Sequence, residues 1–209
     1  MTGSGLAWPP DDSAALEGFP TTRRLPRLLH RVSEHTGTWW FASAPGGGRF
    51  DLPVPDGTCY LADDLEAALG EKLLRRPKKL VPAERLRELL HSRITLQAPL
   101  ELANLTSTRA TGFGVNAEVH TILDYGKPRA WAERLRQAGA RGLRYAARSD
   151  PALRARCVAL FGGAGLHARA PAGMRTDEAP LDARRARRLL EERGVVVVPI
   201  PRDVPIVDR

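Results

Sequence analysis

Cysteine is scarce in this sequence, and its two copies, Cys59 and Cys157, both lie within apolar runs typical of strands. Two such residues do not make a disulfide framework, so we expect buried, reduced thiols in a cytoplasmic protein. No run of about 18 apolar residues occurs, which argues against a membrane-spanning helix and a membrane partner. The first residues also lack the charged and apolar regions of a secretory signal.

Several catalytic motifs are missing as well. The five histidines show no spacing typical of metal ligands, so we expect no metal. There is no P-loop, G-x-x-x-x-G-K-S/T, and no G-x-S-x-G nucleophile elbow. Residues 111–117, TGFGVNA, match the dinucleotide pattern G-x-G-x-x-A. That pattern also requires an Asp or Glu at the end of a second strand about 20 residues later, and no convincing candidate stands there. We therefore reject a dinucleotide site of that type, together with acyl transfer and ATP hydrolysis.

Lysine is rare beside arginine, with only four lysines among the 32 basic residues. The formal net charge of +8 favours anionic partners: a nucleotide, nucleic acid or an acidic protein. The arginine-rich helix predicted at residues 181–194 also carries glutamates at i,i+4 spacing, which favours a solvated face over a nucleic-acid stripe.

Short apolar runs alternate with helical patterns, which predicts an α/β (α+β) fold with a mixed central sheet flanked by helices. Helices are predicted at residues 64–75, 82–90, 128–140 and 181–194, and strands at residues 25–35, 38–44, 57–62, 93–105, 142–150, 156–162 and 195–201.

The expected organisation is one domain with short flanking segments. Residues 1–20 are predicted to form an arm laid on the surface, residues 21–201 the domain, and residues 202–209 a tail. Within the domain we expect a core at 25–162, a long loop rich in Gly, Ala and Pro at 162–180, and a final helix and strand at 181–201.

Residues 46–72, GGGRFDLPVPDGTCYLADDLEAALGEK, concentrate the candidate binding groups. Glycines allow a backbone to approach a ligand closely. Arg49 supplies a fork of donors suited to phosphate, Tyr60 an aromatic face, and Glu71 a carboxylate. Together these groups suit a phosphorylated ligand that contains rings. The alternative is a glycine hairpin, a core strand and a surface helix without a site.

Strand alternation places Tyr60 on the face opposite Cys59 and Leu61. If those two residues face the core, the phenol faces a cleft or solvent. Glu71 lies off the apolar stripe of the next helix, which Asp63 or Asp64 can cap. The carboxylate is open either to a ligand or to an exposed pair with Arg75.

In order along the chain, several segments resemble the RES domain, a family named for an Arg, a Glu and a Ser. The resemblance runs from about residue 25 to 162, roughly two thirds of the chain. Without it, Arg31 would be read as an edge-strand arginine paired with an acid. The matching pieces are LLHRV with Arg31, GGRFD with Arg49, GTCYLADDLEAALGE with Tyr60 and Glu71, and WAERLRQAGARGLRYAARSDP…RCVALFG.

The resemblance implies the toxin half of a bacterial toxin–antitoxin pair, with a fold similar to that of ADP-ribosyltransferases. Such enzymes destroy NAD by cleaving its nicotinamide–ribose bond, with NAD as substrate and no metal. By resemblance, Arg31 and Arg49 would hold the phosphates and Tyr60 would pack on the substrate. Glu71 would be the catalytic carboxylate, with Arg31 also counted in the catalytic set.

One departure from the family pattern concerns its serine. The corresponding strand position holds Ala147, and Ser149 follows two residues later on the same strand face, about 7 Å further along. We include both as substrate-binding candidates. The alanine is expected to weaken activity without abolishing it, and Ala147→Ser to strengthen it.

Other functions stay open at this point. The acceptor of ADP-ribose could be water, phosphate or a protein, the last making the chain an ADP-ribosyltransferase. A weak or silent RES domain is another alternative, and a basic nucleic-acid-binding module a third. The expected partner is an antitoxin of the Xre type with a helix-turn-helix, through which any nucleic acid would be bound. A homo-oligomer is left open.

Overall fold

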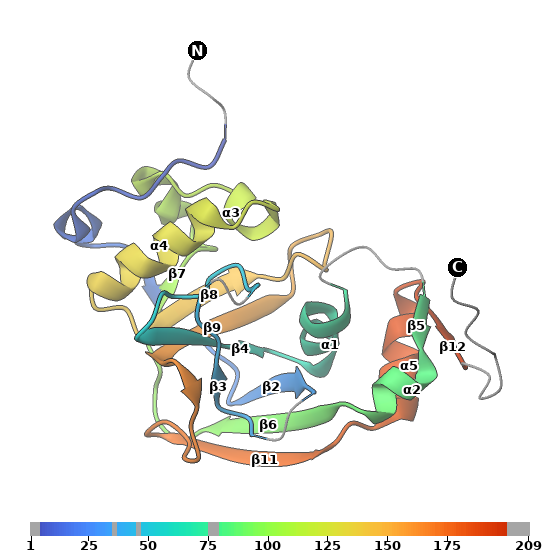
Figure 1. Cartoon of the computed structure of the whole chain (residues 1–209). Coiled ribbons are helices and arrows are strands. Elements are labelled where there is room, and N and C mark those ends of the chain that lie inside the picture. The colour runs from blue at the N-terminus through green and yellow to red at the C-terminus, as the bar shows by residue number, and fades with distance from the viewer. Residues whose placement is uncertain (1–4, 35–36, 45–46, 75–79, 200–209) are drawn as a thin grey trace, which may run out of the picture.

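The structure is a computed structural model that describes residues 5–34, 37–44, 47–74 and 80–199, and its centre is one large mixed sheet (Figure 1). Within these residues the sheet has eight strands in the order β1-β7-β8-β9-β4-β2-β6-β11, and only β7 and β8 pair in parallel. The predicted fold class, a mixed sheet flanked by helices, is confirmed. The strands are β1 (Thr21–Thr22), β2 (Leu28–Ser33), β4 (Asp56–Ala62), β6 (Leu90–Leu96), β7 (Leu102–Asn104), β8 (Gly142–Ala146), β9 (Arg156–Gly163) and β11 (Met174–Pro180).

The helices form two groups around this sheet. In Figure 1, α3 and α4 lie over the β7–β8 end, and α1 lies between the strands and the α2–α5 pair. Two further pairs complete the described structure: β3 with β10, and β5 with β12. The bounds are α1 (Leu65–Leu73), α2 (Ala83–Arg87), α3 (Glu118–Thr121), α4 (Gly126–Gln137), α5 (Ala183–Glu192), η1 (Ser13–Leu16), η2 (Thr108–Phe113), β3 (Trp40–Phe41), β5 (Leu80–Pro82), β10 (Gly165–Leu166) and β12 (Val196–Val198).

Strand β4 is buried on both faces, and its alternation sorts its side chains between two hydrophobic clusters. Cys59 and Leu61 belong to the smaller cluster, with Val158 and Leu160 of β9. Tyr60 packs against the larger cluster, which includes residues of α1, α4 and α5. The predicted opposition of Tyr60 to Cys59 and Leu61 is therefore confirmed.

Helix α1 follows β4 directly and turns its apolar stripe into the larger cluster. Leu65, Leu69 and Leu73 are all buried, and full burial of one such side chain contributes about 1.5–3 kcal/mol. Asp64 caps the helix, its Oδ1 accepting a hydrogen bond from the Ala67 amide at 2.7 Å. This cap and stripe fix the rotation of α1 and so the direction in which Glu71 leaves it.

The N-terminal segment is not a surface arm, contrary to the prediction for residues 1–20. From residue 5 onward it packs on the helical layer, and Leu6, Leu16 and Phe19 are buried. The indole of Trp131 in α4 donates a hydrogen bond to the carbonyl of Ala7 at 2.9 Å. A few apolar residues in an otherwise polar stretch anchor this segment. Their spacing matches neither a helix nor a strand, so the sequence pattern did not predict the packing.

The long loop predicted at residues 162–180 is also wrong over its second half. Strand β11 pairs antiparallel with β6 over seven residue pairs, from Met174↔Leu96 to Pro180↔Leu90. An edge strand can be held by backbone hydrogen bonds to its one neighbour, so its side chains need not alternate between apolar and polar. Because most side chains of β11 are polar, the sequence lacks the apolar alternation that predicts a strand there.

Strand β8 is shorter than the predicted 142–150 and ends at Ala146. The chain then turns, and the Asp150 amide donates a hydrogen bond to the Ala147 carbonyl at 3.2 Å. The Asp150 side chain accepts hydrogen bonds from the amides of Ala152, Arg154 and Ala155. These bonds fold residues 147–155 into a compact connection that redirects the side chains after Ala146.

Other predicted elements are confirmed with shifted ends, among them α4, α2 and α5, the last capped by Asp182 as expected. Residues 111–117 fall in η2 and the turn after it, with Gly114 at φ 94°, and not in a strand–turn–helix unit. The predicted tail, residues 202–209, lies outside the described residues. In the described part of the chain, no helix has the length and apolarity needed to span a membrane.

Candidate active site

The glycine-rich loop before β4 is held by a buried aspartate. Asp51 accepts hydrogen bonds from the Gly48 amide at 2.6 Å and the Tyr60 hydroxyl at 2.7 Å, and the Phe50 amide donates to the same hydroxyl at 2.9 Å. A Cβ on Gly48 would lie 2.2 Å from Asp51 Oδ1 and 2.5 Å from the Tyr60 oxygen. Glycine is therefore required at position 48, and the Tyr60 hydroxyl is hydrogen-bonded to the loop.

Arg49 projects from this loop into a small hollow and is only 8 % exposed. Its Nε and Nη1 atoms are buried and have no hydrogen-bond partner among the described residues. A buried guanidinium without acceptors is unfavourable, and a phosphate group would supply them. Arg49 thus has the properties of an anion-binding residue.

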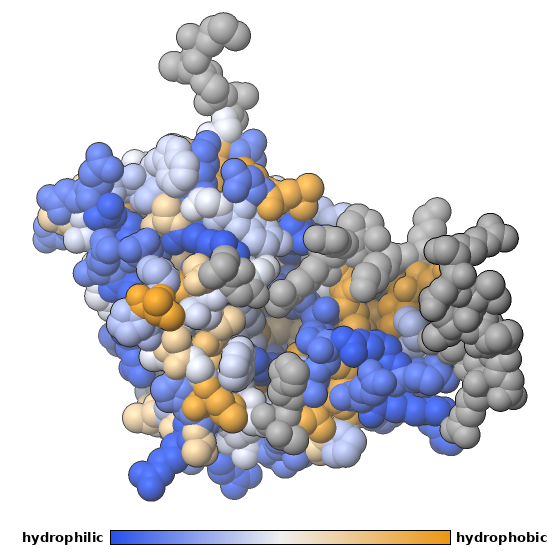
Figure 2. All heavy atoms as spheres, viewed as in Figure 1, coloured by the Kyte–Doolittle hydropathy of each residue, from blue (hydrophilic) through white to orange (hydrophobic). Residues whose placement is uncertain are grey.

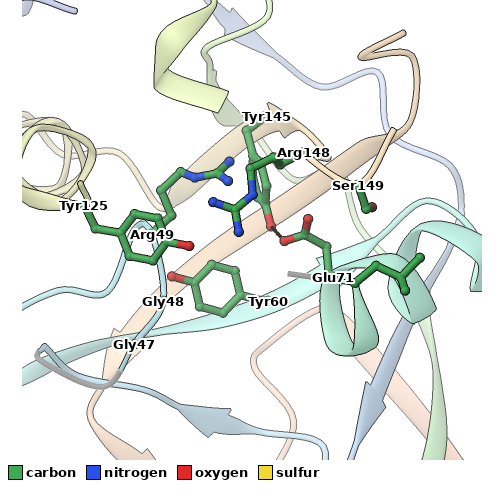
Figure 3. Close-up of a pocket in the computed structure, with 10 residues that line it drawn as sticks. Gly47, Gly48, Arg49, Tyr60, Glu71, Tyr125, Tyr145, Arg148 and Ser149 are labelled. Atoms are coloured by element: carbon green, nitrogen blue, oxygen red, sulfur yellow. Dashed lines mark hydrogen bonds between the residues drawn. The ribbon is translucent and has the colours of Figure 1, made fainter. Parts of the chain in front are cut away.

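Tyr125, just before α4, gathers three arginines around its ring. The guanidinium carbons of Arg49, Arg129 and Arg148 lie 5.8, 5.8 and 5.9 Å from the ring centroid. Arg129 also donates a hydrogen bond to the Gly48 carbonyl at 3.0 Å, which ties α4 to the glycine loop. Figure 3 shows the guanidinium groups of Arg49 and Arg148 directed into the same space above Tyr60.

Glu71 faces this space from the last turn of α1. The hydroxyl of Tyr145, in the buried strand β8, donates a hydrogen bond to Glu71 Oε2 at 3.0 Å (Figure 3). Burial raises the pKa of Tyr145 well above its ordinary value, and the Glu71 charge adds to the effect. The phenol therefore stays protonated and remains a donor.

Ser149 lies beside the same helix. Its Oγ atom is buried and has no hydrogen-bond partner among the described residues. A Cβ on Gly70 would lie 2.3 Å from that oxygen, so α1 and the segment after β8 meet at a glycine. The hydroxyl is thereby held at the hollow, next to the residue that precedes Glu71.

Arg31 enters from a neighbouring hollow, where the large sheet opens. Strands β2 and β4 share only the pair His30↔Ala62. Arg31 Nη1 donates a hydrogen bond to Cys59 Sγ at 2.9 Å, while its buried Nε has no hydrogen-bond partner among the described residues. The cavity volume of this second hollow is about 220 Å³.

The two hollows adjoin, because Gly48, Tyr60 and Glu71 line both. The first hollow is lined by Gly47, Gly48, Arg49, Tyr60, Glu71, Leu74, Tyr125, Tyr145, Arg148 and Ser149. The second is lined by His30, Arg31, Val32, Ser33, Glu34, Trp40, Ala42, Gly48, Asp51, Thr58, Tyr60, Leu61, Ala62, Ala68, Glu71 and Lys72. Arg31, Arg49, Tyr60, Glu71 and Ser149, all named from the sequence, therefore surround one composite cleft.

Ala147 is the exception among the named residues. It is fully buried in the larger hydrophobic cluster and lines neither hollow. The prediction that a serine at this position would meet the substrate assumed that the strand continued to residue 150. Because β8 ends at Ala146, this geometry favours Ser149 instead.

Four lining residues were missed by the sequence reasoning, and their signals were weak. The acid Asp51 stood in the GGRFD piece but was given no role. Tyr145 stood in a strand pattern, where a buried tyrosine looks like core. Tyr125 and Arg148 lie in connections whose positions depend on tertiary packing.

The outer rim of the second hollow carries exposed apolar groups. Trp40 is 46 % exposed and lines the hollow, and its strand partner Leu166 is 57 % exposed. In Figure 2 the surface around β3 and β10 shows orange patches within a mainly blue face. A ligand with an aromatic ring could therefore meet an indole where it enters the cleft.

Both cysteines are free and buried, as predicted. Burial raises the pKa of the Cys59 thiol, with the Arg31 charge opposing it, and burial also raises the pKa of Cys157 well above its ordinary value. Neither thiol is therefore poised as a nucleophile. Within the part of the chain that the structure describes, no three His, Cys, Asp or Glu side chains form a group that could hold a metal ion.

Comparisons with known proteins bear on the family and the fold of the chain. Residues 24–183 match the family model of the RES domain. Among solved structures, the M. tuberculosis MbcT–MbcA toxin–antitoxin complex contains a chain with a similar fold, at a TM-score of 0.61 and 14% sequence identity. The match covers 85% of this chain and 95% of that one. A search of curated proteins found no match.

Proposed function

Because this chain belongs to the RES domain family, we propose that it is a toxin-like enzyme that cleaves the nicotinamide–ribose bond of NAD. The observation that carries the proposal is the position of Glu71. Its carboxylate lies where two hollows meet, hydrogen-bonded by Tyr145, with the buried Arg49 lining one hollow and the half-buried Arg31 lining the other. Fixed negative charge between two cationic anchors matches a dinucleotide that is cationic at its nicotinamide and anionic at its pyrophosphate.

The chemistry asks little of the protein beyond charge and position. Nicotinamide leaves NAD as a neutral ring, so no general acid is needed. As the bond breaks, positive charge develops on the ribose, as in other glycosyl cleavages. The Glu71 carboxylate would stabilise that charge, and an oxygen held in place before the reaction does so without reorganisation.

The remaining residues would position the substrate. Arg49 and Arg31 would bind the pyrophosphate, so that binding energy remote from the bond orients the reacting ribose. The hydroxyl of Tyr60 is used by Asp51 and Phe50, which leaves its ring face for packing on the substrate. Ser149 would offer its unpaired hydroxyl to the ribose or the nicotinamide amide.

An antitoxin is the proposed protein partner. The chain with the similar fold is found in a toxin–antitoxin complex, and a cell that makes an NAD-consuming enzyme needs to restrain it. The net charge of +8 favours an acidic binding surface on that partner. Co-purification with the product of an adjacent gene, and loss of NAD consumption in the complex, would test this proposal.

Release of nicotinamide from NAD by the purified chain tests the proposed function directly. We expect release without any added protein, which corresponds to transfer to water or phosphate. Release that requires an acceptor protein, with ADP-ribose found on that acceptor, would instead indicate an ADP-ribosyltransferase. No release under either condition would overturn the proposal.

A further inference from the structure

We infer that Tyr145 is a positioning residue that holds the Glu71 carboxylate in its reactive orientation, an inference that rests on the proposed function. Neither the sequence patterns nor the family comparison points to this tyrosine. The geometry does, because the hydroxyl donates to Glu71 Oε2 at 3.0 Å and the side chain is 1 % exposed. One oxygen of the carboxylate is thereby fixed on a side chain that lines both hollows.

The tyrosine is held firmly on every side. Strand β8 is buried along its whole length between β7 and β9, and Tyr145 pairs with Cys157. Its ring packs edge-on against Phe50, with centroids 4.9 Å apart and an interplanar angle of 62°. Glu71, by contrast, stands in the last turn of a nine-residue helix, where a long side chain has several rotamers. A rigid donor therefore restricts a flexible acceptor.

The hydroxyl also has a defined proton. The pKa of Tyr145 is raised by burial and by Glu71, and that of Cys157 is raised by burial, so both groups are neutral at working pH. The phenol therefore keeps the proton that it donates to Glu71 Oε2.

Tyr145→Phe tests the inference, since it removes the hydroxyl and keeps the ring that packs on Phe50. We expect kcat for nicotinamide release to fall about 10- to 100-fold, the range for losing a hydrogen bond to a charged group. KM should change little, because Arg31 and Arg49 still bind the substrate. Thr38→Val is the matched control, since it deletes a buried hydroxyl whose partners Ser92 and Glu178 line neither hollow.

A double-mutant cycle separates positioning from a general loss of structure. Glu71→Asp retains the carboxylate but shortens its reach to the phenol. If Tyr145 acts through Glu71, adding Tyr145→Phe to Glu71→Asp should lower kcat by less than about 3-fold further. If Tyr145→Phe did not fold, Glu71→Asp alone should still lower kcat with KM unchanged, and an unchanged kcat would overturn the inference.

The outcomes distinguish the two claims. A wild-type chain that releases no nicotinamide would overturn the proposed function and this inference with it. An active wild type whose Tyr145→Phe variant keeps its kcat, or loses equally in the Glu71→Asp background, would overturn the positioning role alone. The positioning role would be supported if Tyr145→Phe lowers kcat when Glu71 is intact but not in the Glu71→Asp background. Thr38→Val should show no such fall.

Discussion

Ser149 shows how the ending of one strand decides which side chain meets the cleft. Strand β8 stops at Ala146, so the two-residue alternation that would place Ala147 and Ser149 on one face no longer applies. Ala147 is enclosed by the hydrophobic core, while the Ser149 oxygen lies beside Gly70 without a hydrogen-bond partner. The serine that gives the family part of its name would thus be represented here by Ser149.

We therefore predict opposite outcomes for two substitutions at these positions. Ser149→Ala should lower NAD cleavage by about 10-fold while leaving the unfolding temperature nearly unchanged, because the lost hydroxyl has only the substrate as partner. Ala147→Ser should not raise activity, and it should destabilise the fold by about 1–3 kcal/mol by burying an unsatisfied hydroxyl. This revises the expectation from sequence that Ala147→Ser strengthens the enzyme.

Steady-state nicotinamide release and thermal unfolding of both variants would check these outcomes. Ser13→Ala, at the start of η1 and outside both hollows, is the matched control. An Ala147→Ser variant with increased activity and unimpaired stability would show that the aligned position, and not Ser149, serves the substrate.

At the scale of elements, the contact between α1 and the segment after β8 sets the distance across the cleft. That contact is made by Gly70, where a Cβ would lie 2.3 Å from Ser149 Oγ and 3.0 Å from Ser149 Cβ. Glu66 near the start of α1 accepts a hydrogen bond from Arg193 at 2.6 Å, and Arg193 also donates to the Ser149 carbonyl at 3.2 Å. The helix that carries Glu71 is thus docked to the segment after β8, which carries Ser149.

Gly70→Ala should lower the rate of NAD cleavage much more than it lowers the stability of the fold. Alanine favours a helix interior over glycine by about 1 kcal/mol, which offsets part of the clash with Ser149. The cleft must nevertheless widen, so we expect NAD cleavage to fall at least about 10-fold, since small misplacements of reacting groups are costly. Gly112→Ala is the matched control, because a Cβ there has no neighbour within 4 Å. Full activity in Gly70→Ala would mean that this close approach is not needed.

Elements with their own local signals could be predicted from the sequence. The stripe of leucines and the Asp64 cap identified α1, and alternation around Tyr60 gave the orientation of β4, so Tyr60 and Glu71 could both be placed. Strand β11 and the buried N-terminal segment could not, because each depends on a partner distant in sequence. The same holds for Tyr125 and Arg148, which reach the cleft only through the packing of α4 and the turn after β8.

At the scale of the whole molecule, buried histidines link stability to pH. His120 is 6 % exposed, and burial, together with the charges of Arg49 and Arg156, lowers its pKa from 6.5 to about 4. The unfolded chain therefore binds this proton more readily than the folded protein does. The stability associated with neutral His120 is fully present above pH 6.5 and is lost as the pH falls toward 4.

We predict that the free energy of unfolding decreases between pH 6.5 and pH 4, by at most about 3 kcal/mol from this one residue. His91, whose pKa burial and His30 lower to about 4, should add a smaller part because it is more exposed. Urea unfolding across this range should show a shallower slope for His120→Gln than for wild type. His167→Gln, at an exposed histidine, is the control, and identical slopes for wild type and His120→Gln would contradict the prediction.

The whole molecule brings Arg31 from β2, Arg49 from the glycine loop, Glu71 from α1 and Ser149 from the turn after β8 to one cleft. The central claim is that the charge of Glu71 drives cleavage of NAD there. Glu71→Gln keeps the size of the side chain and an oxygen that can accept the Tyr145 hydrogen bond, but it removes the charge.

The most direct test is therefore nicotinamide release by wild type and Glu71→Gln at matched concentrations of folded protein. The account predicts rapid release by wild type and a rate lower by at least about 100-fold in Glu71→Gln, with the same thermal unfolding. An undiminished rate in Glu71→Gln would contradict it.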